Sequence, residues 1–78
     1  MKELRKKILE VLSKGEWVGT VDLYEQLGEG VSFNDFYHEL GKMKDLHMIG
    51  SEETPPTAER GWRAGLKWSI TVVGRRYL

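Results

Sequence analysis

Three polar side chains, Asn34, His38 and Lys42, recur at four-residue intervals near the middle of the chain. Residues four apart lie on the same face of an α-helix. The amide of asparagine can pair with both hydrogen-bonding groups on the major-groove edge of adenine, and lysine can reach guanine or a phosphate. The spacing therefore predicts one helical face, and these groups could contact DNA bases if the fold presents that face to a duplex. The competing interpretation is the solvated polar face that any surface helix has.

Two residues beside this face, Ser32 and Tyr37, each allow two interpretations. Ser32 is predicted as a helix N-cap rather than as a base-contacting residue, although the two roles are compatible. Tyr37 is amphipathic: either its ring packs while its hydroxyl points at a phosphate, or the side chain simply fills the core. Both are candidate DNA contacts.

A second candidate site is a basic stretch that contains an aromatic residue, formed by Arg60, Trp62, Arg63 and Lys67. Basic side chains of this kind clamp phosphates or enter a minor groove. The alternative is a loop that its charges keep in solution. Trp62 could instead pack against the hairpin or a partner protein.

Other kinds of chemistry lack the residues they need. The absence of cysteine excludes a disulfide framework, a thiolate zinc site and a cysteine nucleophile. His38 and His47 have no third metal ligand nearby in the sequence. The Gly28-x-Gly30 pair follows a predicted helix rather than a strand, unlike a phosphate-binding loop. We therefore expect no catalytic activity, no cofactor and no metal.

The 78 residues are enough for one small domain, residues 1–78, and 40% of them are hydrophobic. The formal net charge is zero, which taken alone disfavours binding to phosphates. The charge is nevertheless segregated, at +3 for residues 1–14, −8 for 15–59 and +5 for 60–78. A fold that joins the two ends would present a cationic face. No apolar run reaches the ~18 residues of a membrane span, and no signal peptide is evident, so we expect a cytoplasmic protein.

Apolar residues at helical spacing predict the elements that position these candidates. A first helix covers Lys2 to Lys14, and its apolar face is made of Leu4, Ile8, Leu9, Val11 and Leu12. A second, shorter helix follows Thr20, which is predicted as its N-cap. Gly28 and Gly30 end that helix in a tight turn.

The third helix has the clearest predicted start, because Ser32 and Asp35 have the spacing of a capping box. Its apolar periodicity runs from Phe33 to Leu46. Gly41 interrupts it, either to permit close approach of another backbone or of DNA, or as a tolerated defect.

In the second half of the chain, apolar and polar residues alternate with the two-residue period of a β-strand. Leu66, Trp68 and Ile70 alternate with polar residues, which predicts a strand, and Met48 to Glu53 is its predicted partner. Residues 54–62 then form the tip of the hairpin, where no helix is expected. Thr71 is predicted to cap a short final helix that covers residues 72–78. Trp17 and Trp68 are both expected in the core.

Two stretches resemble a known family. The segment FYHELGKMKDLHMI, residues 36–49, resembles the recognition-helix signature of PadR-type transcriptional regulators, Leu-Tyr-x-x-Leu-x-x-Leu-x-x-x-Gly-Leu-Ile. The segment KWSITVVGRRYL, residues 67–78, is similar to the family's basic-Tyr-x-Leu-Thr-x-x-Gly-x-x-x-Leu. His47 stands where the family has glycine. The family normally continues into dimerising C-terminal helices, and this chain stops at Leu78, so a homodimer or a partner protein stays open.

The element order and the resemblance together imply a winged helix-turn-helix. This is a mainly α fold with a small β-hairpin (α+β), in which three helices precede a two-stranded wing and a short C-terminal helix. The resemblance implies sequence-specific binding to double-stranded DNA and control of transcription. The third helix would enter the major groove, and the wing would lie on flanking backbone or in the minor groove.

The alternative is a winged helix that serves as a protein-interaction module. The zero net charge and the acidic middle segment favour it. The two interpretations differ in what surrounds Lys42. If Asp35 and Glu39 both face outward beside it, phosphate would be repelled and the interaction module would be favoured.

Overall fold

The computed structural model describes residues 2–15, 17–28, 30–61 and 65–78. Within these ranges the chain is an α+β domain with four α-helices and one three-stranded antiparallel sheet. In chain order the elements are α1 (Lys2–Ser13), β1 (Val18–Gly19), α2 (Thr20–Gln26), α3 (Phe33–Asp45), β2 (Ile49–Thr54), the one-turn 3-10 helix η1 (Ala58–Arg60), β3 (Gly65–Ile70) and α4 (Val72–Tyr77). No helix in the described ranges is long and apolar enough to cross a membrane.

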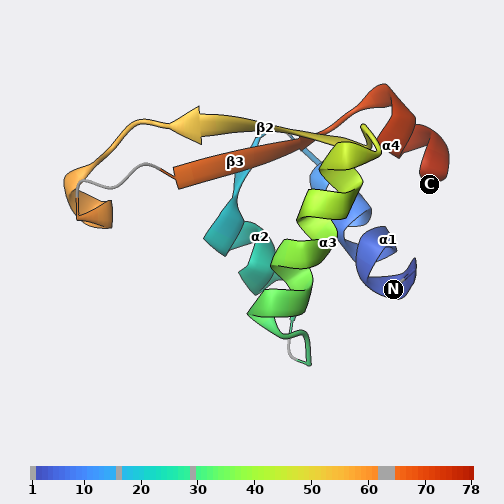
Figure 1. Ribbon diagram of the computed structural model, residues 1–78, viewed down its shortest axis with the longest axis horizontal. Coiled ribbons are helices and arrows are strands. Elements are labelled where there is room, and N and C mark those ends of the chain that lie inside the picture. Colours follow the sequence, from blue (N-terminus) through green and yellow to red (C-terminus); the bar gives the residue numbers. More distant parts are fainter. Residues whose placement is uncertain (1, 16, 29, 62–64) are drawn as a thin grey trace.

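The long hairpin of β2 and β3 runs across one end of the helices and projects beyond them, while α4 lies at the opposite end (Figure 1). The strand order is β1-β3-β2, so β3 is central and pairs on both sides. In the register, Ile49 lies opposite Ile70 and Ser51 opposite Trp68. Because side chains alternate along a strand, Ile49, Trp68 and Ile70 share the face that packs on the helices.

The core lies between this sheet face and one side of each long helix. The predicted apolar face of α1 is confirmed, since its leucines and Ile8 are buried, while Val11 is partly buried against them. From α3 the core receives Phe36, Leu40 and Met43, and Met48 enters it just beyond the helix. Trp68 is 3% exposed, as expected.

The predicted turn before α3 is confirmed. Gly28 and Gly30 have φ angles of 84° and 91°, which glycine adopts without steric cost. The hydroxyl of Tyr24 donates to the carbonyl of Val31 at 2.6 Å and so ties α2 to the turn. Ser32 is the N-cap of α3, and its Oγ accepts a hydrogen bond from the amide of Asp35 at 3.1 Å. The helix therefore begins at the predicted cap, although Ser32 and Asp35 form only one of the two hydrogen bonds of a capping box.

The C-terminal end of α3 is a Schellman motif. The amide of His47 donates to the carbonyl of Lys44, and the amide of Met48 donates to the carbonyl of Met43, each at 3.0 Å. His47 has a φ of 61°, the left-handed conformation this motif requires. Histidine therefore takes the conformation that glycine normally provides, at some steric cost.

Residues from α4 close this corner. The hydroxyl of Thr71 donates to the carbonyl of His47, and its amide donates to the carbonyl of Met48 at 3.0 Å. The same hydroxyl oxygen accepts from the amide of Gly74 at 3.2 Å, which confirms Thr71 as the predicted cap of α4. A Cβ added at Gly74 would overlap the carbonyl oxygen of Met48 and lie 2.8 Å from Ile70 Cγ1. The threonine and glycine thus hold α4 directly on the end of α3.

Two predictions at the start of α2 were wrong. The N-cap is Gly19, and Thr20 is the first helical residue. Its hydroxyl is used elsewhere, because it donates to the carbonyl of Leu66 at 3.0 Å and accepts from the indole N–H of Trp68 at 2.8 Å. Trp17 is 44% exposed rather than buried. The short strand β1, which was not predicted, pairs Val18 with Trp68 and leaves Trp17 on the other face.

Smaller differences have local causes. Leu46 is 50% exposed, because α3 ends at Asp45 and the chain turns away. Phe33 is also exposed on one side, although its ring packs edge-on against Tyr24 with centroids 5.1 Å apart. The hairpin tip contains the single turn η1, where no helix was expected. A Cβ on Gly41 would meet no atom within 4 Å, so this glycine serves no close approach within the described chain.

The two helical glycines give a matched pair of variants. Gly74→Ala should lower the free energy of unfolding by about 3 kcal/mol, because its methyl group overlaps the backbone of Met48. Gly41→Ala should raise it by about 1 kcal/mol, since the site is open and alanine is the better helix former. Urea unfolding followed by circular dichroism measures both. Equal stabilities for the two variants would contradict the packing of α4 described here.

The left-handed residue at the end of α3 gives a second test. His47→Gly should raise the free energy of unfolding by about 0.5 kcal/mol, because glycine adopts a positive φ without strain. His47→Val should lower it by at least about 1 kcal/mol, since a branched side chain is most strained there. Both variants lose the imidazole, so the difference between their stabilities does not depend on contacts of that ring. A valine variant as stable as the glycine variant would show that the helix does not end in this way.

Candidate nucleic-acid interface

The residues predicted to contact bases lie together on the exposed face of α3. Asn34, His38 and Lys42 are all exposed, and their four-residue spacing places them on one side of the helix. Gly41 and Asp45 share that side, being seven and eleven residues after Asn34. The opposite side of α3 is buried in the core. The structure therefore presents the predicted face to solvent as a continuous surface.

The two acidic residues near Lys42 differ in orientation, which the periodicity of the sequence alone did not show. Asp35 is exposed, whereas Glu39 is turned inward and is only 3% exposed. The protein-interaction module would be favoured if both acidic residues faced outward beside Lys42. Only Asp35 does so. With Asp45 and the lysines Lys42 and Lys44, the exposed formal charges of α3 cancel.

Glu39 is neutralised by a residue from α1. The Nε of Arg5 donates to Glu39 Oε2 at 2.6 Å, and the two side chains are 19% and 4% exposed. The hydrogen bond to Glu39 raises the pKa of the Arg5 guanidinium, an effect that partial burial opposes. The guanidinium also lies 5.9 Å from the ring centroid of Tyr77 in α4. This ion pair links three helices and removes one negative charge from the surface of α3.

The ring of Tyr37 packs within the chain, as the core interpretation expects, while its hydroxyl stays accessible, as a phosphate contact requires. Its ring packs against that of Phe33, with centroids 5.9 Å apart, yet 47% of the residue is exposed. Its hydroxyl makes no hydrogen bond to any part of the chain that the structure describes, which leaves it available to a ligand. Ser32, by contrast, already uses its hydroxyl oxygen as the N-cap acceptor, although the residue is exposed.

The basic stretch of the hairpin is described in part. Trp62 and Arg63 lie outside the described residues, and for Arg60 the structure gives the backbone in η1. Lys67 points to the outer face of the sheet, since its neighbour Trp68 points to the core. There its ammonium lies 4.0 Å from Glu52 and 5.3 Å above the ring centroid of Trp17. Lys67 therefore has two partners within the chain and faces away from α3.

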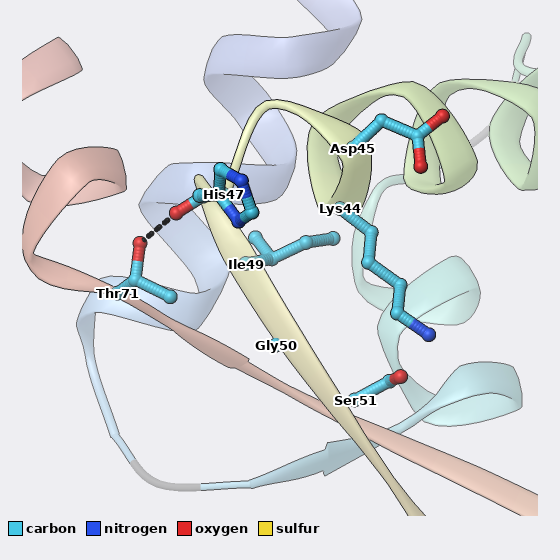
Figure 2. A pocket seen from close by; sticks show the side chains of 7 residues that line it. All are labelled: Lys44, Asp45, His47, Ile49, Gly50, Ser51 and Thr71. Atoms are coloured by element: carbon cyan, nitrogen blue, oxygen red, sulfur yellow. Dashed lines mark hydrogen bonds between the residues drawn. The ribbon is translucent and has the colours of Figure 1, made fainter.

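Sequence reasoning missed a recess of about 560 Å³ between the end of α3 and the start of β2 (Figure 2). It is lined by Lys44, Asp45, His47, Ile49, Gly50, Ser51 and Thr71. The alternation of the predicted hairpin could have placed Ser51 on the helix side, two residues after Ile49. The sequence could not show that Lys44 lies near β2, because this proximity depends on the turn at His47 that brings β2 back along α3.

The described side chains form no cluster of three or more His, Asp and Glu residues that could hold a metal ion. No known protein family, curated protein or solved structure matches this chain.

The ion pair between α1 and α3 can be tested by its coupling. Arg5→Met leaves the carboxylate of Glu39 buried without its partner and should lower the free energy of unfolding by about 3 kcal/mol. Glu39→Leu in the same chain should recover most of that loss, because the double variant buries no uncompensated charge. Lys6→Met, an exposed neighbour on α1, is the matched control. A coupling energy below about 0.5 kcal/mol in urea unfolding would mean that the pair does not hold the helices.

Proposed function

We propose that this chain is a winged helix that binds double-stranded DNA with sequence preference and controls transcription, as its resemblance to PadR-type regulators implies. The observation that carries the proposal is the exposed face of α3. Asn34, His38 and Lys42 project from it together, and the acidic residue Glu39 is withdrawn to the core and paired with Arg5. A helix of this kind places amide, imidazole and ammonium groups where base edges lie in a major groove.

The hairpin supports the same proposal through its position. It leaves α3 at the Schellman turn and projects past the helices, so that it can follow a duplex bound to α3 (Figure 1). The hydrogen bonds of Thr71 to His47 and Met48 fix the angle between the two elements. A fixed angle is what lets one element read bases while the other contacts the flanking backbone.

The roles follow from residue chemistry. Asn34 pairs with adenine, Lys42 and His38 reach base edges or phosphates, and the hydroxyl of Tyr37 donates to a phosphate. In the hairpin, the proposed contacts to the backbone or minor groove are Arg60, Trp62, Arg63 and Lys67. Lys67 can contribute only by leaving Glu52 and Trp17, which makes it the weaker of these contacts. The proposal assigns the chain no catalytic step.

A protein-interaction module is the second candidate, and one observation favours it. Helix α4 exposes Val72, Val73 and Tyr77, of which Val72 is 67% exposed. Apolar side chains gathered on one short helix are a common feature of surfaces that meet another protein. The partner would be a second copy or a different protein, and the balanced charge of α3 is compatible with either.

The variant Asn34→Ala tests the proposed base contact. After selection of a preferred duplex, this change should relax the preference at one base position by about 1–3 kcal/mol and leave binding to random duplexes nearly unchanged. Fluorescence anisotropy with single-base variants of the selected site measures the preference. Gln26→Ala, an exposed change at the end of α2, is the control.

Two results would count against the proposal. If Asn34→Ala and the wild type discriminate equally at every position, Asn34 does not read a base. If the wild type binds no duplex even at about 50 mM salt, where phosphate contacts are strong, the interaction module becomes the better explanation.

A further inference from the structure

The recess between α3 and β2 contains one cation and one hydroxyl that point toward each other. Figure 2 shows the side chain of Lys44 extending from α3 along β2 toward the hydroxyl of Ser51. The carboxylate of Asp45 points away from the ammonium of Lys44, although the residue lines the same recess. The imidazole of His47 stands at the other end.

Neither of these two groups has a partner within the described residues. Lys44 makes no ion pair and the Ser51 hydroxyl makes no hydrogen bond there, whereas Arg5 is paired with Glu39 and Lys67 with Glu52. An ammonium beside a hydroxyl supplies several hydrogen-bond donors and one positive charge. The ligand that such a pair suits is an anion with several acceptor oxygens, such as a phosphate group.

Both walls of the recess are fixed. The end of α3 that carries Lys44 is held by the Schellman hydrogen bonds and by Thr71. Ser51 lies in the ladder of β2 opposite Trp68, itself buried and bonded to Thr20. The backbones that carry the two groups therefore need no rearrangement to meet a ligand, which lowers the entropic cost of binding.

The position of Lys44 connects the recess to the proposed DNA contacts. Lys44 is seven residues after Tyr37, so both lie on the same side of α3, next to the face of Asn34 and His38. We propose that this recess holds a phosphate of the DNA backbone between Lys44 and Ser51, at the edge of the major groove that α3 enters. This inference rests on the proposed function and names the contact that would set the register of α3 on the duplex.

Nearby acidic residues limit the strength of this contact. Glu53 follows Ser51 by two residues and lies on the same face of β2, and it is exposed. Its carboxylate repels a phosphate approaching the recess. Glu53→Gln should therefore strengthen binding to every duplex, a gain that damage to the fold cannot produce.

The experiment measures the affinity of a labelled random duplex and of the selected duplex at several salt concentrations by fluorescence anisotropy. One lost phosphate contact reduces the slope of log K against log salt by about 0.9. Lys44→Gln should therefore weaken both duplexes alike, and its deficit relative to wild type should shrink about threefold between about 50 and 200 mM salt. Ser51→Ala should weaken both duplexes without changing the slope. Lys14→Gln, which removes an exposed lysine at the end of α1, should change neither.

The outcomes separate this inference from the proposed function. If the wild type binds duplex but Lys44→Gln behaves like Lys14→Gln, DNA binding stands and the phosphate contact is wrong. If the amide signals of Gly50 and Ser51 move in NMR spectra with inorganic phosphate but not with a short duplex, the recess is a general anion site and the contact to the DNA backbone is wrong. If no duplex binds the wild type at low salt, the proposed function fails first and the inference falls with it.

Discussion

The arrangement of this domain depends on the few hydrogen bonds where α3 ends. The turn at the end of α3 leaves the backbone carbonyls of His47 and Met48 beside the core. Without hydrogen-bond partners these two carbonyls would destabilise the fold. Thr71 satisfies both with its hydroxyl and its amide, and it can do so because Gly74 lets α4 approach without a Cβ. One threonine and one glycine thereby set the direction in which the hairpin leaves α3.

This corner also gives a physical reason for the Thr-x-x-Gly spacing on which the proposed resemblance to PadR-type regulators partly rests. The Thr-x-x-Gly of residues 71–74 is a cap followed by a close helix contact. The position where that signature has glycine requires a positive φ, and His47 adopts it. Histidine in place of the signature's glycine therefore adds steric strain to the turn but leaves its backbone conformation unchanged. A second tie, from Arg5 to Glu39, sets the orientation of α3 against α1 and leaves the outer face of α3 free.

Much of the fold could be predicted because its signals are local. The apolar faces of α1 and α3, the cap at Ser32, the alternation of β3 and the cap at Thr71 each depend on residues within a few positions of one another. The errors came from contacts between distant residues. Thr20 has the side chain of a cap, yet its hydroxyl is taken by Trp68 and by the backbone at Leu66. Trp17 looks like a core residue, yet the unpredicted pairing of β1 with β3 turns it outward.

The candidate site likewise has one part that local signals predict and one part that depends on contacts between distant residues. Periodicity was sufficient to place Asn34, His38 and Lys42 on one face, because a single helix carries them. It could not show that Glu39 is withdrawn from the surface, since its partner Arg5 lies 34 residues away. The recess of Lys44 and Ser51 escaped notice for the same reason, because it exists only once β2 has folded back along α3.

The closeness of α1 and α4 has a consequence for the order in which the domain folds. Leu9 packs near Gly74, and Arg5 lies over the ring of Tyr77, so two helices far apart in the sequence complete the same part of the core. Contacts between such distant residues close a long loop, and the entropy of that loop is lost before the contacts stabilise the fold. We therefore expect α4 to dock on α1 late in folding, after the helices and the hairpin have formed from their local contacts.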